Sequence, residues 1–266
     1  MKIFFSDMDG TLLNSQKEIT PKTKAALDAF TDAGNTFVIS TGRPIFSARY
    51  IRDYHGLNYP GSYISAYNGS MLYDNTNHTV LYEDGIAVDL IPELLDLAER
   101  FGVYIQGYQG DYVISRVASE EFEYYKKSLH MDGLVDKDFM PLIHGPSPKM
   151  IAIALQEHER LDALAKAIDE SLGDVISTAR SADRHLEIYP ATGNKGNALI
   201  RLCEILHIPI EDSLAAGDEE NDIPMLRAAG CGIAMANARP SVQAAADTIT
   251  EKDNDHDGLV PYLLHP

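Results

Sequence analysis

The strongest local indication of the fold lies near the start of the chain, in Ile3-Phe4-Phe5-Ser6-Asp7-Met8-Asp9-Gly10-Thr11. Its first three side chains are large and apolar, which predicts a short strand buried on both faces. Asp7 and Asp9 follow that strand directly, and Gly10 allows the chain to turn sharply. The hydroxyl of Thr11 can then bond a neighbouring carboxylate. The segment predicts a buried strand that ends in two acidic side chains, although an acidic loop that caps a helix would have a similar sequence.

Strands and helices alternate in the residues that follow. Pro21 begins a helical pattern with one apolar face, and residues 36–39 form a second apolar run. The segment Thr41-Gly42-Arg43-Pro44 ends that run, and residues 45–54 suit another helix. This rhythm predicts an α/β fold with a doubly wound parallel sheet, in which ligands bind at the carboxyl ends of the strands. Asp7 and Thr41 both fall at such ends.

The pattern changes between residues 85 and 190, where we predict an inserted α/β domain built on a mostly antiparallel sheet. Its expected helices cover 91–101, 120–129 and 160–172, and its expected strands cover 103–105, 112–115, 150–155, 175–177 and 186–189, with a loop over 132–148. The doubly wound rhythm then resumes with helices at 197–206 and 223–229 and strands at 214–216 and 233–235. The predicted core domain therefore comprises residues 1–84 and 191–266.

The composition is typical of an acidic globular protein. Hydrophobic residues make up 45% of the 266 residues, which excludes a wholly disordered chain, and the formal net charge is -18. Such a charge repels polyanions, so we expect neither nucleic acid nor an anionic membrane as a partner. No apolar run approaches the roughly 18 residues of a membrane span, and the two cysteines have no metal-ligand spacing. We expect a soluble, cytoplasmic protein that is a monomer or a weak homo-oligomer.

A second acidic segment, Gly217-Asp218-Glu219-Glu220-Asn221-Asp222, also follows an apolar run, residues 213–216. Asp218 and Asp222 can point into the same crevice as Asp7. Two unit charges about 4 Å apart interact by about 4 kcal/mol at an effective dielectric of 20, so converging carboxylates need a cation. Oxygen ligands that are few in number and completed by water and phosphate favour Mg²⁺ over Ca²⁺ or Zn²⁺.

Two further polar residues carry little information when each is taken alone. Lys195 lies in Gly193-Asn194-Lys195-Gly196 at a predicted helix start, where an ammonium and backbone N–H groups favour an anion. A surface lysine could occupy the same place. Thr41 can likewise be a strand-end hydroxyl that bonds within a turn. Their meaning depends on the order in which they occur with the acidic segments.

The ordered combination consists of Asp-x-Asp-Gly-Thr, Thr-Gly-Arg-Pro, a lysine at a helix start, and Gly-Asp-x-x-Asn-Asp. Together these four motifs resemble the haloacid dehalogenase superfamily, and the resemblance spans the whole chain. The insertion between Thr41 and Lys195 further resembles the Cof-type sugar-phosphatase branch, which carries an α/β cap of type IIB. Asn68-Gly69 and the segment Leu186-Glu187-Ile188-Tyr189-Pro190 are also similar to that branch. The resemblance implies a Rossmann-like catalytic core with residues 85–190 as its cap.

The resemblance also implies a phosphatase reaction with a role for each motif. Asp7 is then the nucleophile that becomes an aspartyl phosphate, while Asp9 protonates the leaving alcohol and later activates water. Thr41 and Lys195 hold the phosphoryl oxygens, and Lys195 also neutralises Asp7. The Mg²⁺ ion is bound by the Asp7 carboxylate, the Asp9 main-chain carbonyl and Asp218.

Other residues of the motifs have supporting roles in the implied site. Asp222, together with Thr11, orients the groups that bind the metal. Arg43 reaches the phosphate or the leaving group, or else orders its loop through a salt bridge, and Asn68 bonds a substrate hydroxyl. Asn221 bonds Lys195 or phosphate. The substrate contacts that the resemblance implies are therefore Thr41, Gly42, Arg43, Asn68, Lys195 and Asn221.

The implied substrate is a small phosphorylated metabolite, because a cap that closes over the core excludes both water and large partners. Sugar phosphates are the leading expectation. Lys149, Arg184, His185 and Glu187 are candidates to face the substrate, although each can equally be structural. A phosphomutase, or a phosphatase dedicated to a flavin or pyridoxal phosphate, remains an alternative. A phosphorylatable receiver-like or binding protein is the non-enzyme alternative, although receivers are about half this length and carry no cap.

A third acidic segment, Asp253-Asn254-Asp255-His256-Asp257-Gly258, imitates the opening of an EF-hand calcium loop. Leu264 occupies the twelfth position of that loop, where a bidentate glutamate is needed. We therefore expect no calcium site, and predict that Asp257 caps a short helix over residues 259–264.

Overall fold

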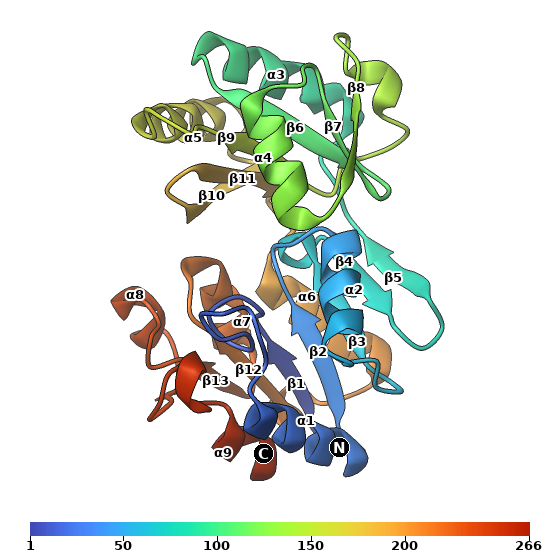
Figure 1. The fold of residues 1–266 in the computed structure, drawn as a ribbon, viewed down its shortest axis with the longest axis vertical. Helices are drawn as coiled ribbons and strands as arrows, with labels where there is room; N and C mark the ends of the chain where they lie inside the picture. Colours follow the sequence, from blue (N-terminus) through green and yellow to red (C-terminus); the bar gives the residue numbers. More distant parts are fainter. The chain divides into compact units, whose positions relative to one another are not determined.

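The computed structural model describes residues 1–266, which divide into two compact units (Figure 1). Unit 1 comprises residues 1–42, 48–82 and 194–266, and unit 2 comprises residues 43–47 and 83–193. Most of unit 2 is thus one continuous insertion into the chain of unit 1. Lipid-spanning helices are absent, because none is both long and apolar enough to cross a membrane.

Unit 1 is built on an eight-stranded sheet. Its strands, in sheet order, are β14 (Thr248–Ile249), β13 (Cys231–Ala234), β12 (Ser213–Gly217), β1 (Ile3–Ser6), β2 (Thr36–Ser40), β3 (Tyr63–Ala66), β4 (Met71–Asp74) and β5 (Thr79–Glu83). The strands from β14 to β3 are parallel, and β3 pairs with β4 antiparallel. Every residue of β1, β2 and β12 is buried, as strands covered on both faces require. The predicted α/β fold with a doubly wound parallel sheet is confirmed.

The carboxyl ends of β1 and β12 lie at the point where the strand order of the sheet reverses. The chain passes from β1 to β2 through α1 (Pro21–Asp32), and from β12 to β13 in the opposite direction through α7 (Ile223–Ala228). Right-handed crossovers in opposite directions put these two helices on opposite faces. The strand order therefore reverses between β1 and β12, which is where ligands bind in open α/β sheets.

Four more helices complete unit 1. They are α2 (Ile45–Tyr54), whose first residues belong to unit 2, α6 (Lys195–Leu206), α8 (Pro240–Gln243) and α9 (Val260–Leu264). α9 packs against α1, and α6 packs against α7. α1 begins where sequence chemistry predicts, because Thr20 caps it by accepting from the Thr23 N–H and Pro21 fills its first position.

Unit 2 is built on a six-stranded sheet with three helices. The strands, in sheet order, are β10 (Ile176–Ala182), β11 (His185–Pro190), β9 (Met150–Ile153), β6 (Tyr104–Gln109), β7 (Tyr112–Ser115) and β8 (Asp132–Val135). All neighbours are antiparallel except β7 and β8, which are parallel and joined through α4 (Glu120–Leu129). The remaining helices are α3 (Ile91–Arg100) and α5 (Glu159–Leu172). The expected mostly antiparallel sheet is therefore present in this part of the chain.

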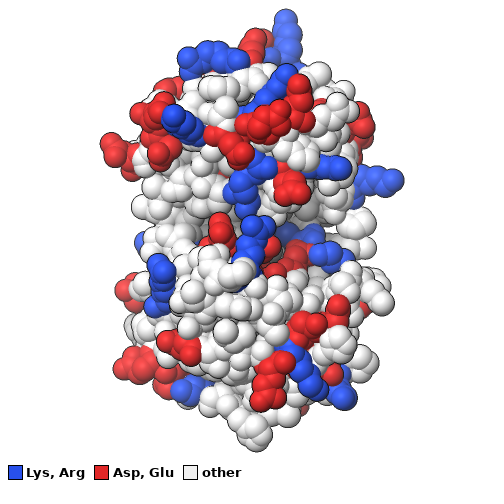
Figure 2. Space-filling model, turned by 90° about the vertical axis from the view of Figure 1, so that its left-hand side faces the viewer, with Lys and Arg blue, Asp and Glu red and all other residues white.

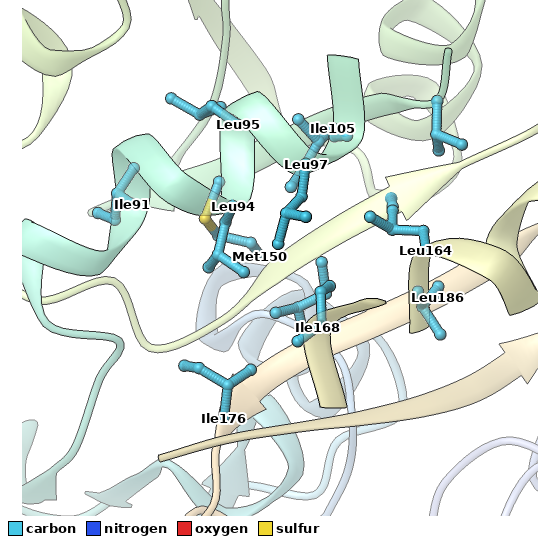
Figure 3. Packing of buried hydrophobic residues seen from close by; sticks show 14 of the residues in the cluster. Ile91, Leu94, Leu95, Leu97, Ile105, Met150, Leu164, Ile168, Ile176 and Leu186 are labelled. Carbon is cyan, nitrogen blue, oxygen red and sulfur yellow. The ribbon is translucent and has the colours of Figure 1, made fainter. Parts of the chain in front are cut away.

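The hydrophobic core of unit 2 lies between the sheet and the helices α3 and α5 (Figure 3). Leu94 and Leu97 of α3 and Leu164 and Ile168 of α5 are buried against the sheet. The strands contribute alternate residues, among them Ile105, Met150, Leu186 and Ile188. Because successive strand residues point to opposite faces, the intervening residues of these strands lie on the other face of the sheet.

The structure contains strands where the sequence predicts none. β8 lies within residues 132–148, which are expected to be a loop. The sequence pattern does not indicate this strand, because it contains a glycine and three of its four residues are exposed. β10 continues to Ala182, well beyond the expected 175–177. The sequence prediction missed its second half because Ala179-Arg180-Ser181 contains no large apolar side chain. The addition of β4, antiparallel to β3, and of β5 to the edge of the core sheet is likewise absent from the sequence prediction.

The prediction that Asp257 caps the last helix is wrong. α9 begins at Val260 and Leu259 occupies the capping position, while Asp257 has a left-handed backbone with φ of 64°. The Asp257 carboxylate instead accepts a hydrogen bond from the Thr20 hydroxyl. The acidic segment therefore ties the C-terminal loop to the start of α1.

Charged side chains of both signs are mixed over the surface. On the face that Figure 2 shows, Lys and Arg side chains are interspersed with Asp and Glu side chains on each unit, without a continuous basic area. The chain has 22 Lys and Arg residues against 40 Asp and Glu residues, so acidic side chains are in excess.

Candidate active site

Asp7 stands one residue beyond the end of β1. Its N–H donates to the Ala216 carbonyl at 2.9 Å, so the pairing of β1 with β12 holds the backbone of Asp7 in place. Gly10 follows with φ of +92°, and a Cβ atom there would lie 2.3 Å from Asp218 Oδ2. Only glycine therefore lets this loop pass so close to the Asp218 carboxylate.

Lys195 is the first residue of α6, and its ammonium lies between two carboxylates. Asn194 caps the helix, because its Oδ1 accepts from the Asn197 N–H at 2.9 Å. Lys195 Nζ donates to Asp7 Oδ1 at 2.5 Å and to Asp222 Oδ1 at 2.6 Å. The lysine side chain has no exposed surface, so these two carboxylates replace its water shell.

Both carboxylate oxygens of Asp222 accept hydrogen bonds. While Oδ1 accepts from Lys195, Oδ2 accepts from the backbone N–H groups of Asp218 and Glu219 at 2.9 and 3.0 Å. Asp222 is fully buried. Its carboxylate therefore has a fixed orientation and fixes the loop that carries Asp218.

Asp218 stands one residue beyond the end of β12. Its Oδ1 accepts from the Thr11 hydroxyl at 2.7 Å, which joins the loop after β12 to the loop after β1. Carboxylate oxygens of Asp7, Asp218 and Asp222 all lie within 4.8 Å of one another. The structure thus brings together five of the residues that the sequence singles out, from segments more than 200 positions apart.

The electrostatics of this cluster favour an added cation. Burial raises the pKa of Asp7 well above its usual value, although Lys195 opposes that rise. Burial also raises the pKa of Asp218 to about 7, opposed by the hydrogen bond from Thr11. Burial disfavours the Lys195 ammonium, but Asp222 and Asp7 outweigh it and raise the pKa of Lys195. Three carboxylates share one ammonium, so the cluster carries excess negative charge.

The donor set of this cluster fits a hard divalent cation. Its side-chain ligands are all carboxylate oxygens, and the two cysteines lie outside it. Hard cations such as Mg²⁺ prefer such ligands and keep several waters, whereas zinc sites usually include nitrogen or sulfur. A Mg²⁺ ion would also remove the cost of ionising Asp7 and Asp218 together.

Asp9 has a partner that the sequence does not suggest. Its Oδ1 lies 2.9 Å from Lys17 Nζ, and about one third of the Asp9 side chain is exposed. Lys17 has φ of +63° in a turn in which the Asn14 side chain accepts from the Gln16 and Glu18 N–H groups. Asn14 is a recognisable turn former, but only the path of the loop brings Lys17 to Asp9.

A second group of predicted residues meets around Asn68. The Asn221 amide donates to Asn68 Oδ1 at 3.0 Å, and the Asn68 N–H donates to the Thr41 carbonyl at 3.1 Å. Tyr67 and Asn68 both have left-handed backbones, with φ of 52° and 58°, in a 3-10 turn. A Cβ atom on Gly42 would lie 2.8 Å from Asn68 Oδ1, so Gly42 makes room for that amide.

The remaining predicted residues lie in unit 2. Arg43 Nη1 donates to Ser47 Oγ at 3.3 Å. Lys149 and Glu187 form an ion pair with each other, and His185 packs edge-on against the Tyr125 ring with 5.4 Å between centroids. Arg184 is exposed.

Comparison with known proteins identifies clear relatives over almost the whole chain. The family model of haloacid dehalogenase-like hydrolases matches residues 4–263. The proposed phosphatase YxeH of Bacillus subtilis is 32% identical over 273 residues, which cover 99% of this chain and 97% of that protein. YitU of the same organism, named a 5-amino-6-(5-phospho-D-ribitylamino)uracil phosphatase, is 28% identical over 97% of this chain and 94% of its own length.

A comparison with solved structures identifies the same family. A haloacid dehalogenase-like hydrolase from Bacteroides thetaiotaomicron superposes with a TM-score of 0.88 at 28% identity, covering 98% of each chain. The resemblance that rests on four short motifs therefore extends to the complete fold.

Proposed function

The chain belongs to the haloacid dehalogenase-like hydrolases and is a phosphatase, and we propose that it hydrolyses small phosphate monoesters with Mg²⁺ through an aspartyl phosphate on Asp7. The observation that carries this proposal is the Lys195 ammonium, held at 2.5 Å from Asp7 and 2.6 Å from Asp222, with Asp218 in the same cluster. An ammonium in this place opposes the rise in the pKa of Asp7 that burial causes, and so favours the ionised form that a nucleophile needs.

In the first step, an Asp7 carboxylate oxygen forms a bond to phosphorus while the bond from phosphorus to the leaving oxygen breaks. Asp9 gives its proton to that oxygen, so the leaving group departs as an alcohol. Asp9 then takes a proton from water, whose oxygen attacks phosphorus and releases phosphate from Asp7. The partly exposed Asp9 side chain suits an acid that exchanges protons with solvent.

The metal requirement is a proposal about the acidic cluster. Mg²⁺ would be held by the carboxylates of Asp7 and Asp218 and by the main-chain carbonyl of Asp9, and when bound it would neutralise phosphate oxygens. Thr11 would fix the Asp218 carboxylate, because its hydroxyl donates to it. Asp222 would fix both Lys195 and the backbone of Asp218, because its carboxylate accepts from the Lys195 ammonium and from the Asp218 N–H. Neither needs to touch the metal.

We assign the phosphate contacts to Thr41 and Gly42, which follow β2, and to Lys195, the first residue of α6. Asn221 and Asn68, which bond each other, would contact phosphate or a substrate hydroxyl. Arg43 would reach the phosphate or leaving group from the segment that follows Gly42. These assignments follow the family motifs residue by residue and are tested by substitution.

We further propose that unit 1 is the catalytic domain and unit 2 the cap, and that the protein acts in the cytoplasm as a monomer or weak homo-oligomer. The substrate class is a sugar phosphate or a related metabolite. The name of YitU supports one alternative, a phosphatase for a ribitylamino-uracil phosphate. A phosphomutase would need an activating bisphosphate and would release no inorganic phosphate. The phosphatase assignment replaces the receiver-like alternative.

Phosphate release from about a hundred phosphorylated metabolites and from phenyl phosphate tests the proposal. We expect hydrolysis that stops in EDTA and returns with Mg²⁺, together with a hydroxylamine-sensitive phosphoenzyme in rapid-quench samples. Rates that are unchanged in chelator would contradict the metal requirement. Turnover without any acyl phosphate on residue 7 would contradict the covalent mechanism.

A further inference from the structure

The loop that carries Asp9 is held by two asparagines from near the end of the chain. Asn254 Nδ2 donates to the Leu13 carbonyl at 2.8 Å, and Asn237 Nδ2 donates to the Gly10 carbonyl at 2.8 Å. The two asparagines also bond each other, because the Asn254 N–H donates to Asn237 Oδ1 at 3.2 Å. All of these residues belong to unit 1, although 241 and 227 positions separate the two amides from the carbonyls that they bond.

Leu13 connects this restraint to the backbone around Asp9. The Leu13 N–H donates to the Met8 carbonyl at 2.8 Å, and Leu13 forms an isolated parallel β-bridge with Asp9. Leu13 is also buried, so packing holds it in place. The backbone of Leu13 is therefore bonded on one side to the turn that carries Asp9 and on the other side to the Asn254 amide.

The next residues of the loop are held by the neighbour of Asn254. Asp255 Oδ1 accepts from both the N–H and the hydroxyl of Ser15, at 2.7 and 2.8 Å. Lys17 follows two residues later, and its ammonium lies 2.9 Å from Asp9 Oδ1. Asn254 and Asp255 are adjacent, so a single short segment restrains the loop at two points between Asp9 and Lys17.

The direction of the Asp9 side chain matters for the proposed reaction. About one third of that side chain is exposed, so packing alone does not fix it. A general acid must lie within hydrogen-bond reach of the leaving oxygen, at about 2.6–3.2 Å. A displacement of about 1 Å can cost about 10²-fold in rate. A restraint on the turn that carries Asp9 therefore bears directly on proton transfer to the leaving group.

We propose that Asn254, supported by Asn237 and Asp255, is a positioning residue that directs the general acid Asp9 at the leaving oxygen. This inference rests on the proposed phosphatase function. A network that only stabilises the fold is the competing explanation. It predicts that substitutions lower stability and slow the hydrolysis of every ester by the same factor.

The test uses two aryl esters that differ in their need for an acid. Phenolate is a strong base and leaves faster when it is protonated, whereas 2,4-dinitrophenolate is a weak base and leaves without a proton. We compare kcat/KM for phenyl phosphate and for 2,4-dinitrophenyl phosphate at saturating Mg²⁺. This quantity includes the steps up to release of the leaving group and excludes hydrolysis of the phosphoenzyme. The ratio of the two values therefore measures how well Asp9 acts as an acid.

The variant Asn254→Asp keeps the shape of the side chain but replaces the donor to Leu13 with a carboxylate oxygen, which the carbonyl repels. We expect the ratio to fall at least about tenfold, in the same direction as the larger fall in Asp9→Asn. The matched control is Asn35→Ala, because Asn35 Oδ1 accepts from the Lys2 N–H at 2.9 Å and so also bonds a distant backbone group of unit 1. It should leave the ratio unchanged. An unchanged ratio in Asn254→Asp would overturn the proposal.

A double substitution decides whether Asn254 acts through Asp9. In an Asp9→Asn background, Asn254→Ala should change the ratio less than about twofold, because the acid that Asn254 positions is already absent. A further fall of about tenfold there would overturn the proposal. Asn254→Ala alone takes the place of Asn254→Asp if thermal unfolding shows that Asn254→Asp is not folded. Wild-type protein that releases no phosphate from phenyl phosphate, or an unchanged ratio in Asp9→Asn, would instead refute the proposed function.

Discussion

The two units each bury one lysine almost completely, and the two lysines have different surroundings. Lys195 in unit 1 has no exposed surface and meets Asp7 and Asp222 at 2.5 and 2.6 Å, with Asp218 beside them. Lys149 in unit 2 has 1% exposure and meets one carboxylate, Glu187. The first cluster carries an excess of negative charge, and the second is balanced.

The comparison shows that burial of a charged side chain does not by itself specify a ligand. Ionising a group away from water costs several kcal/mol, and nearby opposite charge must offset that cost. Where the opposite charge is in excess, as around Lys195, a cation and then an anionic phosphoryl group can bind. Around Lys149, by contrast, the Glu187 carboxylate supplies an opposite charge within the same unit.

The largest expected effect is the loss of turnover when the carboxylate beside Lys195, but not the one beside Lys149, is replaced by an amide. Asp7→Asn removes the carboxylate beside Lys195 and should lower kcat at least about 10³-fold, because the amide cannot form the acyl phosphate. Glu187→Gln is the equivalent change beside Lys149 and should retain measurable turnover. Phosphate release from phenyl phosphate measures both. Comparable activity in Asp7→Asn and wild type would remove Asp7 as the nucleophile.

Replacing each buried lysine tests how many carboxylates surround it, and the free energy of unfolding is the measured quantity. Lys195→Met and Lys149→Met each leave a buried carboxylate unpaired and should lower the free energy of unfolding by about 3 kcal/mol. Only Lys195→Met leaves a cluster of three carboxylates, so only this variant should regain much of that loss in millimolar Mg²⁺. Urea unfolding with and without Mg²⁺ makes the comparison. Equal rescue of both variants would show that the ion acts elsewhere.

Two glycines with similar backbones test how closely the acidic cluster is packed. Gly10 and Gly34 have φ of +92° and +83°, but a Cβ atom on Gly10 would meet Asp218 Oδ2 at 2.3 Å, whereas Gly34 has open space. Both alanine variants should lose about 1 kcal/mol of stability from backbone strain. Gly10→Ala should in addition weaken Mg²⁺ binding about 10- to 100-fold in calorimetry, as displaced ligand geometry does. Matching Mg²⁺ affinities in the two variants would contradict the tight packing.

The smallest effect concerns pH. Burial raises the pKa of Asp218 to about 7, so protons compete with Mg²⁺ below that pH. The apparent dissociation constant should rise by up to about tenfold for each pH unit below 7 and level off above it. The folded state binds this proton more tightly than the unfolded state, so the metal-free protein should gain stability as pH falls from 8 to 6. Calorimetric Mg²⁺ titrations and urea unfolding at several pH values check both slopes; a flat Mg²⁺ affinity would argue against Asp218 as a ligand.

The sequence predicts much of the fold because buried parallel strands and capped helices leave local signals. β7, α2 and α4 have the predicted limits, and β1 and β2 lie within one or two residues of theirs. β8 and the second half of β10 escape prediction because they are polar or exposed strands, whose conformation depends on pairing with neighbours. Local propensity carries little information about such pairing.

The contacts of the candidate site also fall into those that the sequence predicts and those that it does not. The residues that meet around Lys195 each follow a predicted strand or begin a predicted helix, so the parallel sheet determines that they converge. Lys17 reaches Asp9 through the path of an irregular turn, and Lys149 reaches Glu187 through the register of β9 and β11. Neither path nor register is visible in residue spacing. The catalytic roles themselves stay predictions until the substitutions are made.

The central position of β1 in its sheet has a consequence for how the protein is made. β1 pairs on one edge with β2, which is synthesised soon afterwards, and on the other edge with β12, which begins at residue 213. A nascent chain that has already folded β1 and β2 therefore presents the other edge of β1, which is mostly apolar, unpaired to its surroundings while residues 41–212 emerge from the ribosome. Such an edge favours pairing with other chains, so we expect the N-terminal strands to be prone to aggregation until β12 has been synthesised.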